Sequence, residues 1–288
     1  MLERTNKIGR HLPTSGGLAR TLDAARAQGC ETAQIFVSNP QGWADPTLRA
    51  DAEAFVEGSR EIDLSPVVVH AKYLINLAST NEALRERSGR ALALELVAAG
   101  ALGAELVVVH AGSHGGDGEK KGMARLVEGL LRAKELAADL AGSGRVAEVV
   151  VENSVGAGTQ LCSTFASLGQ VAEAGVRVCL DTAHAFVAGY DLSVPGEARR
   201  VREELGGPDG VAVVHLNDAR NGFGSHRDGH SKIGEGRIPE PFWRELFAAL
   251  PEVPAIMETP YGGPEADTEE VRRVKGIAGG LPVSPRGV

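Results

Sequence analysis

The sequence predicts an α/β fold, a (β/α)8 TIM barrel formed by a single domain. Short runs of consecutive valine, isoleucine and leucine recur along the chain, separated by longer segments with apolar residues at helical spacing. Continuous apolar runs are typical of parallel strands that are covered on both faces. Eight such alternations within 288 residues favour a closed barrel, with an open, doubly wound sheet as the alternative.

Eight segments are predicted as strands, the first of them weakly. They are residues 7–11, 33–38 (AQIFVS), 66–71 (PVVVHA), 106–112 (LVVVHAG), 148–154 (EVVVENS), 176–184 (VRVCLDTAH), 211–218 and 254–260 (PAIMETP). Helices are predicted between them at residues 18–26, 48–56, 84–99, 126–140, 165–174 and 242–250. Several of these helices stop at a glycine, the usual C-terminal signal. The barrel should span residues 1–275, and the Gly- and Pro-rich tail 276–288 should be loose.

Composition limits the classes of function. With 43% apolar residues and a formal net charge of −8, the chain is typical of a globular protein without a generic polyanion-binding surface. Bound metal cations are absent from that charge and would change the local field. The cysteines, Cys30, Cys162 and Cys179, lie far apart without a CxxC motif, which predicts reduced, buried thiols in a cytoplasmic protein. The charged N-terminus indicates no signal peptide, and charged residues interrupt the longest apolar run, so no membrane span is predicted.

Six of the eight predicted strands end on a side chain that can bind a metal ion. These residues are His70, His110, Glu152, Asp181, His215 and Glu258. Because the carboxyl ends of barrel strands meet on one face, we expect the six side chains to lie together. Buried imidazoles and carboxylates are costly unless they are paired or bind a cation. One such residue could be an ordinary part of the core, but six at equivalent positions predict a metal site.

Three further residues extend this set: His184 lies three positions after Asp181, and Asp228 and His230 lie in a polar loop. Taken alone, Asp228 could form a turn and His230 could be a surface imidazole. Five histidines and four carboxylates without a thiolate suit zinc or manganese rather than an iron–sulfur cluster. Nine donors exceed the needs of one ion, so two or three ions with one bridging carboxylate are expected. His11, at the end of the first strand, is predicted to support the ligands.

The motifs around these residues resemble those of the endonuclease IV family of abasic-site DNA repair enzymes. They are HAKYLINLAS (70–79), HAGSH (110–114), ENSVGAGTQL (152–161), CLDTAHAFVAGYDL (179–192), HLNDARNGFGSHRDGHSKIGEG (215–236) and METP (257–260). The resemblance runs from about Ile8 to Pro260, nearly the whole chain, and the order and spacing of the motifs are specific. It implies a TIM barrel with a trinuclear zinc site.

The resemblance also implies which residues hold each ion. One zinc ion would be held by His70, His110 and Glu152. Glu152 would bridge to a second ion held by Asp181, His215 and Glu258. The third ion would be held by His184, Asp228 and His230. Every one of these positions carries the expected residue type, and manganese at one position is the alternative because it shares these ligands.

The implied reaction is hydrolysis of the phosphodiester 5′ to an abasic site in double-stranded DNA, leaving a 3′-hydroxyl and a 5′ deoxyribose phosphate. Clustered zinc suits this reaction because water held by a metal loses its proton near neutral pH, so that metal-activated hydroxide serves as the nucleophile. Glu152 is the candidate to orient this hydroxide. A monomer is expected, since it suits an enzyme that bends DNA.

The resemblance places lesion recognition in two loops. Tyr73 and Leu74 resemble the residues that wedge into the base stack while the damaged nucleotide is turned out, although packing is the ordinary role of such a pair. Asn39, Gln41 and Trp43 lie in the position of the family's recognition loop. Many relatives carry arginine where Gln41 stands here, so the minor-groove contact should be weaker while the metal chemistry is unaffected.

Two other functions compete with this interpretation. A xylose isomerase-like sugar isomerase or epimerase also ends strands on residues matching Glu152, Asp181, His215 and Glu258, and it works with one or two ions. The additional set of His184, Asp228 and His230 favours the endonuclease, because a small-sugar site has no use for a third ion. A lesion-binding protein without turnover is the second alternative, and the complete set of ligands argues against it.

Overall fold

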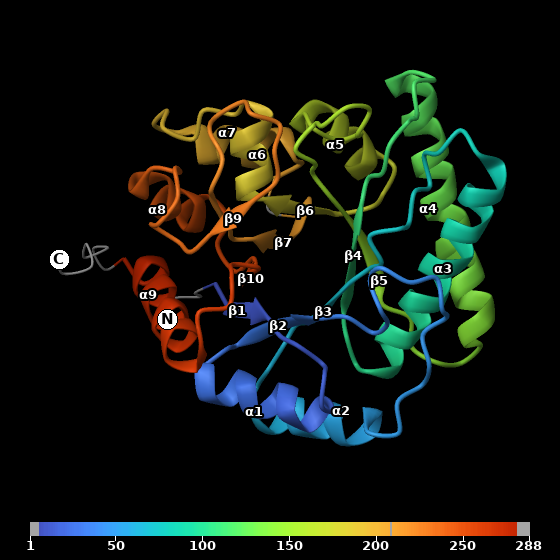
Figure 1. The fold of residues 1–288 in the computed structure, drawn as a ribbon, viewed down its shortest axis with the longest axis horizontal. Coiled ribbons are helices and arrows are strands. Elements are labelled where there is room, and N and C mark those ends of the chain that lie inside the picture. The colour runs from blue at the N-terminus through green and yellow to red at the C-terminus, as the bar shows by residue number, and fades with distance from the viewer. Residues whose placement is uncertain (1–5, 208, 281–288) are drawn as a thin grey trace.

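Eight parallel strands close into a barrel, as the sequence predicts (Figure 1). The computed structural model describes residues 6–207 and 209–280. The barrel strands are β1 (Ile8–His11), β2 (Thr32–Ile35), β3 (Val67–His70), β4 (Leu106–His110), β5 (Glu148–Glu152), β6 (Val178–Asp181), β7 (Val211–His215) and β10 (Ala255–Met257). Their order around the barrel is β1-β10-β7-β6-β5-β4-β3-β2. A short antiparallel hairpin, β8 (Asp218–Ala219) and β9 (His230–Ser231), lies outside this sheet.

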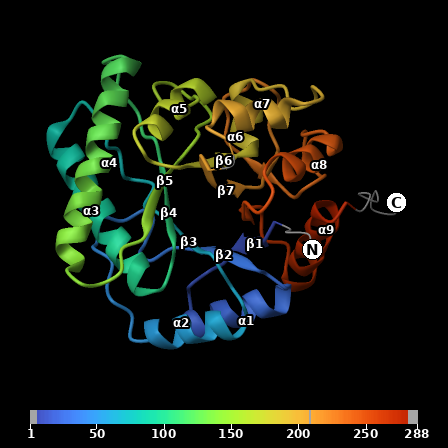
Figure 2. The same cartoon turned by 180° about the vertical axis from the view of Figure 1, so that it is seen from behind.

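Helices surround the barrel in an outer ring, which both ribbon views show (Figures 1 and 2). They are α1 (Leu18–Gln28), α2 (Ala52–Glu61), α3 (Glu82–Ala101), α4 (Glu119–Ala141), α5 (Phe165–Glu173), α6 (Thr182–Ala188), α7 (Glu197–Glu204), α8 (Glu240–Ala249) and α9 (Pro264–Ala278). The six predicted helices are all present. The sequence analysis missed α6, α7 and α9, because α6 is short and α7 (EARRVREE) is almost entirely polar.

Three predicted boundaries were wrong, each for a local reason. The predicted strand 176–184 ends at Asp181, whose side chain caps α6 by accepting a hydrogen bond from the His184 backbone N–H at 2.7 Å. The helix predicted at residues 84–99, with Gly100 as its stop, continues through Gly100 to Ala101; a Cβ atom at Gly100 would stand 2.1 Å from the Arg145 carbonyl oxygen. Leu48 is 79% exposed and precedes α2, which begins at Ala52.

The predicted tail boundary lies close to the end of the last helix. Helix α9 continues to Ala278, so the first residues of the predicted tail 276–288 are helical. Residues 281–288 of that tail lie outside the described residues. No helix in the described ranges is long and apolar enough to cross a lipid bilayer.

The barrel interior forms a core of its own, separate from the larger core between strands and helices. Its members are Val68, Leu106, Val108, Val150, Cys179, Ala212, Val213 and Ile256. Side chains two residues apart on a strand point to the same face. Because Val68, Val150 and Val213 point inward, the residues two positions later point inward as well, at the carboxyl end of the barrel.

The three cysteines are buried free thiols, as predicted. Burial raises the pKa of Cys30 to about 11 and the pKa values of Cys162 and Cys179 to about 12. We expect the native protein at pH 8 to react with Ellman's reagent far more slowly than the protein in guanidinium, because only thiolates react. All three thiols should titrate in denaturant. A thiol that reacted equally fast in both states would contradict this burial.

Candidate metal centre

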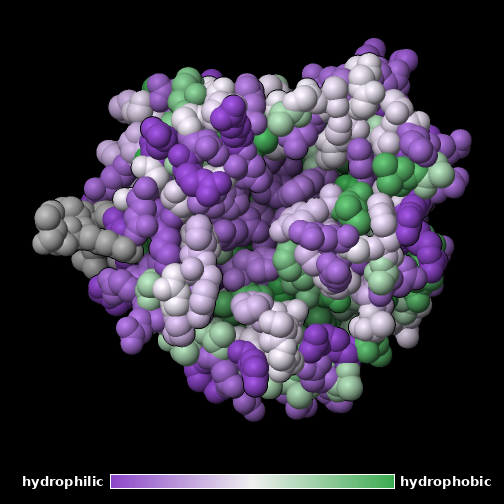
Figure 3. Space-filling model, viewed as in Figure 1, coloured by the Kyte–Doolittle hydropathy of each residue, from purple (hydrophilic) through white to green (hydrophobic). Residues whose placement is uncertain are grey.

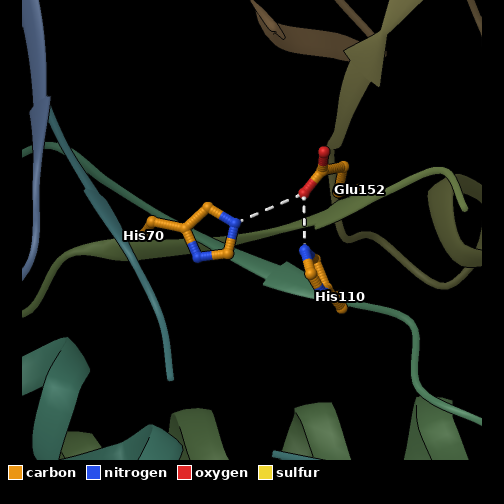
Figure 4. Close-up of side chains that lie close together, drawn as sticks. All are labelled: His70, His110 and Glu152. Atoms are coloured by element: carbon orange, nitrogen blue, oxygen red, sulfur yellow. Dashed lines mark ion pairs between the residues drawn. The ribbon is translucent and has the colours of Figure 1, made fainter. Parts of the chain in front are cut away.

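The ends of the barrel strands bring the predicted ligands together at the mouth of the barrel. His70, His110 and Glu152 form one group, in which the donor atoms lie within 4.8 Å of one another (Figure 4). The Nε2 atoms of His70 and His110 lie 3.5 and 3.3 Å from Glu152 Oε2. His70 donates its Nδ1–H to the Ala71 carbonyl at 2.7 Å, which leaves the Nε2 lone pair directed at the carboxylate.

A second group contains Glu152, Asp181, His215 and Glu258. The Nδ1 atom of His215 lies 3.1 Å from Glu152 Oε1 and 3.2 Å from Glu258 Oε2. His215 donates its Nε2–H to the side-chain oxygen of Gln34 at 2.8 Å, so Nδ1 is the atom with a free lone pair. Because Glu152 contributes an oxygen to both groups, it lies where a bridging carboxylate would be needed.

A third group forms around His184 and His230, on α6 and β9. Both Nε2 atoms lie 3.4 Å from Asp228 Oδ1, and His230 Nε2 also lies 3.6 Å from Asp181 Oδ2. His184 and His230 donate Nδ1–H to the backbone carbonyls of Asn153 and Glu258, at 2.9 and 3.3 Å. The structure therefore brings together all nine predicted ligands. The donor atoms of Asp181, His184 and His230 lie within 4.8 Å of one another, so Asp181 belongs to this group as well as to the second.

Two buried polar atoms of the cluster lack a hydrogen-bond partner, which favours binding of a cation there. Glu152 Oε2 and His230 Nε2 are buried and form no hydrogen bond. A buried polar atom without a partner costs roughly 1–3 kcal/mol, and a bound cation would remove that cost. Imidazole lone pairs that face carboxylates also repel them unless a proton or a cation lies between. The donors, all nitrogen or oxygen, fit divalent ions such as zinc.

The pKa values of the clustered side chains also indicate that the site favours bound positive charge. Burial alone would lower the pKa of His184, but Asp181, Asp228 and Glu152 raise it well above its usual value. Burial alone would raise the pKa of Glu152, but His215, His110 and His70 hold it well below its usual value. Without a cation, the raised pKa values of His70, His184 and His215 favour protons on these imidazoles, while the lowered pKa values of Glu152 and Glu258 keep these carboxylates ionised.

Gln34 is a buried residue that the sequence analysis did not identify. Besides accepting from His215, its side-chain Nε2 donates to Glu258 Oε1 at 2.6 Å and to His11 Nδ1 at 3.0 Å. Burial lowers the pKa of His11 to about 4, so this imidazole stays neutral and can accept. His11 thus contacts the ligands through Gln34. The signal in the sequence was an amide among the mostly apolar residues of the predicted strand 33–38. The structure buries Gln34 completely.

Two asparagines that the sequence analysis also missed hold the carboxylates in place. Asn153 accepts from the Asp181 backbone N–H at 2.7 Å and donates to its carbonyl at 3.0 Å. Asn217 donates to Asp181 Oδ2 at 2.7 Å and accepts from the Glu258 backbone N–H at 2.8 Å. Their positions in the sequence could have identified them, because each asparagine follows a predicted ligand at a strand end by one or two residues.

Tyr73 stands at the mouth of the site. Its side chain is 48% exposed, and its ring stacks on that of His110 with centroids 5.6 Å apart. Its backbone N–H donates to the Pro40 carbonyl, so the two predicted recognition loops contact each other. Beneath it, the buried ion pair of Lys72 and Glu95 (Nζ–Oε1 3.0 Å) anchors the turn to α3. Leu74, predicted as its companion, is half-buried.

The other predicted recognition residues lie apart from the ligands. Asn39 and Gln41 are exposed, and Asn39 accepts a hydrogen bond from the Gln41 backbone N–H within their own loop. Trp43 packs against the outer core, and the guanidinium of Arg87 lies 4.4 Å from its ring centroid. None of the three lines the cavity over the metal groups.

That cavity has a volume of about 650 Å³. Its lining includes seven of the nine predicted ligands together with Tyr73 and Phe36. Figure 3 shows the hollow in the middle of the face seen in Figure 1, with hydrophilic residues around it and apolar residues along one edge. A second, smaller hollow of about 230 Å³ adjoins it between Tyr73 and Gln160. The site is therefore open to a large substrate.

Comparison with known proteins connects this geometry to a family. A family model described as xylose isomerase-like TIM barrel matches residues 22–275. A probable endonuclease 4 of Oleidesulfovibrio alaskensis is 40% identical over 294 residues, covering 96% of this chain and 98% of that protein. The crystal structure of endonuclease IV from Thermus thermophilus has a TM-score of 0.84 at 35% identity, covering 96% of this chain and 100% of that one.

Sugar-epimerase structures share the fold alone. The crystal structure of a D-tagatose 3-epimerase-like protein has a TM-score of 0.71 at 21% identity, covering 95% of this chain and 98% of that one. The likeness to the endonucleases is much stronger in sequence and equally complete in length. The chain therefore belongs to the endonuclease IV family of xylose isomerase-like TIM barrels.

Proposed function

We propose that this protein is a DNA repair endonuclease that hydrolyses the phosphodiester 5′ to an abasic site, leaving a 3′-hydroxyl and a 5′ deoxyribose phosphate. The observation that supports it best is the convergence of nine imidazole and carboxylate side chains in three adjoining groups around Glu152. A sugar isomerase has no use for the third group, around His184 and His230. Membership of the endonuclease IV family points to the same activity.

Three zinc ions are the proposed cofactors, with manganese as the alternative at one position. When bound, such ions lower the pKa of water to near neutrality and neutralise charge on phosphoryl oxygens. His70 and His110 would hold one ion, Asp181, His215 and Glu258 a second, and His184, Asp228 and His230 a third. Glu152 would bridge the first two and orient the attacking oxygen. Water adds to phosphorus, the P–O3′ bond breaks, and a proton passes to the leaving 3′-oxygen.

Double-stranded DNA with abasic sites is the proposed partner, bound by a monomer in the cytoplasm. The buried free thiols suit a reducing compartment. Asn39, Gln41, Trp43, Tyr73 and Leu74 are the proposed DNA contacts. Of these, Tyr73 has the strongest support because it lies exposed beside His110 at the cavity. Gln41 carries no charge, so the contribution of its loop to affinity should be small.

Replacing Tyr73 by alanine should weaken binding to an abasic duplex more than it slows the chemical step. Stacking of an aromatic ring on a base contributes roughly 1–3 kcal/mol, which corresponds to a loss of roughly 5- to 150-fold in affinity. The dissociation constant and the single-turnover rate should be measured for Tyr73→Ala, with Tyr73→Phe as the control that keeps the ring. If neither quantity changed, Tyr73 would be a packing residue.

The direct test combines elemental analysis of the purified protein with a nicking assay on a defined abasic duplex. About three zinc ions per chain and incision on the 5′ side would support the proposal. Bound metal without nicking would favour the alternative of a lesion-binding protein without turnover, and a binding assay on the same duplex would test that alternative. Epimerisation of a ketose in place of nicking would favour the sugar-processing alternative.

A further inference from the structure

Arg220 lies at the edge of the candidate metal centre and has no role in the proposed ligand sets. It follows β8 directly and lines the 650 Å³ cavity together with Asp228 and His230. It is the one arginine or lysine among the residues described as lining that cavity, whose other charged or titratable members are acids, imidazoles and a tyrosine. A fixed positive charge beside a candidate metal site would repel the metal ions, so we consider a role toward a negatively charged substrate.

The backbone that carries Arg220 is held firmly. Its N–H donates to the Gly229 carbonyl at 2.9 Å, which continues the β8–β9 pairing of Ala219 with His230. The buried carboxylate of Asp218 anchors the base of this hairpin by accepting four backbone N–H groups at 2.8–2.9 Å. The donors are Ala219, Gly234, Gly236 and Ile238. Arg220 is therefore attached to the same rigid unit as the ligand His230.

Gly229 makes room for the guanidinium between two ligands. A Cβ atom at Gly229 would lie 3.1 Å from both Nε and Nη2 of Arg220. The guanidinium therefore rests against the backbone between Asp228 and His230, where a side chain at position 229 would push it away. The absence of a side chain at Gly229 brings a positive charge next to the third metal group.

The Arg220 side chain has no partner within the described residues. No carboxylate lies within 4.0 Å of its guanidinium, and its N–H groups form no hydrogen bond there. Arg10, Arg125 and Arg177, by contrast, each pair with an acidic side chain. A planar guanidinium with free donors matches the oxygens of a phosphate, which it can bind with two parallel hydrogen bonds.

We infer that Arg220 binds a non-bridging oxygen of the substrate phosphodiester beside the group formed by His184, Asp228 and His230. This inference rests on the proposed function. A guanidinium stays protonated and does not bind metal ions, so Arg220 acts on the substrate rather than on the metal. It supplies the phosphate with a fixed cation on the side of the cavity formed by the hairpin.

The test compares Arg220→Ala and Arg220→Lys with a charge-matched control. Arg199→Ala removes the same charge from α7, where the arginine is exposed and its side chain forms no hydrogen bond or ion pair within the described residues. Each zinc-loaded protein is titrated with inorganic phosphate by calorimetry and assayed for kcat and KM on an abasic duplex. Metal content and the thermal midpoint are recorded for every variant.

Arg220→Ala should weaken phosphate binding about tenfold and lower kcat/KM by roughly 10- to 100-fold, which is less than the roughly 10²- to 10³-fold loss seen when a central charge-stabilising donor is removed from an active site. Arg220→Lys should recover part of the phosphate affinity and part of kcat/KM, because lysine keeps the positive charge but lacks the paired N–H donors of the guanidinium. Metal content should not change, and Arg199→Ala should behave as the unaltered protein.

Three outcomes would overturn the inference: unchanged phosphate binding in Arg220→Ala, loss of metal in that variant, or an equal effect of Arg199→Ala. If Arg220→Ala folds poorly, Arg220→Gln, which keeps most of the side chain without its charge, takes its place in the same measurements. If the unaltered protein binds phosphate through Arg220 but does not nick abasic DNA, the proposed function fails while the phosphate site stands.

Discussion

Replacing Glu152 by alanine should abolish nicking of an abasic duplex, with kcat falling by roughly 10²- to 10³-fold or more. Glu152 is the residue that the first two groups share, and its oxygens lie 3.1–3.5 Å from the imidazoles of His70, His110 and His215. Its loss would leave His70 and His110 without the carboxylate that faces them, and His215 with Glu258 alone. The measurement is the single-turnover rate, together with the number of zinc ions retained.

Glu148→Ala is the matched control for this variant. Glu148 lies at the opposite end of the same strand, where it is partly exposed and pairs with Arg177 at 2.6 Å. Its replacement should leave nicking within about twofold, since partly exposed ion pairs contribute little to stability. Full activity in Glu152→Ala, with metal still bound, would remove Glu152 from the proposed reaction.

Removing the metal should abolish activity and lower the thermal midpoint by roughly 10 °C. An ion present at a thousand times its dissociation constant stabilises the folded state by about 4 kcal/mol, and this contribution disappears on chelation. The buried ligands would then be left as mutually repelling or protonated groups. Differential scanning calorimetry before and after dialysis against a strong chelator measures the shift, and added zinc should restore it.

The metal-free protein should also become less stable as the pH rises from 6.5 to 8.5. Burial alone would lower the pKa values of His70 and His184 in the folded state. The neighbouring carboxylates outweigh burial and raise both pKa values above the ordinary value of 6.5. The folded state therefore holds protons that the unfolded state has lost, so their stabilising effect is complete below pH 6.5 and fades through the folded pKa. The lowered pKa values of Glu152 and Glu258 act only in the acid range.

Urea midpoints at pH 6.5, 7.5 and 8.5 measure this trend with and without zinc. The loaded protein should show a weaker dependence on pH, because the ions take the place of the protons. A metal-free protein that became more stable toward pH 8.5 would contradict the proton affinities of the cluster. Equal midpoints with and without zinc would contradict metal binding itself.

Much of the candidate site was predictable because the pattern of a barrel strand indicates both where the strand ends and which side chains point into the barrel. An apolar run that ends on His70, Glu152 or His215 places that side chain at the carboxyl end, and the period of two directs it inward with the residue two positions earlier. The closed barrel then collects these ends on one face. His184 was predicted as a ligand but placed on a strand, because the capping role of Asp181 depends on a turn that strand patterns do not reveal.

The sequence by itself determined the barrel, the order of its strands along the chain and the identity of the donors, because apolar periodicity and strand-end chemistry are local properties. The tertiary structure alone decided which donors share a group, which imidazole nitrogen faces the cavity, and how Gln34, Asn153 and Asn217 hold them. It also decided that Arg220 rests against Gly229 without a partner in the described part of the chain. These features join residues far apart in the chain, and their distances exist only once the barrel has closed.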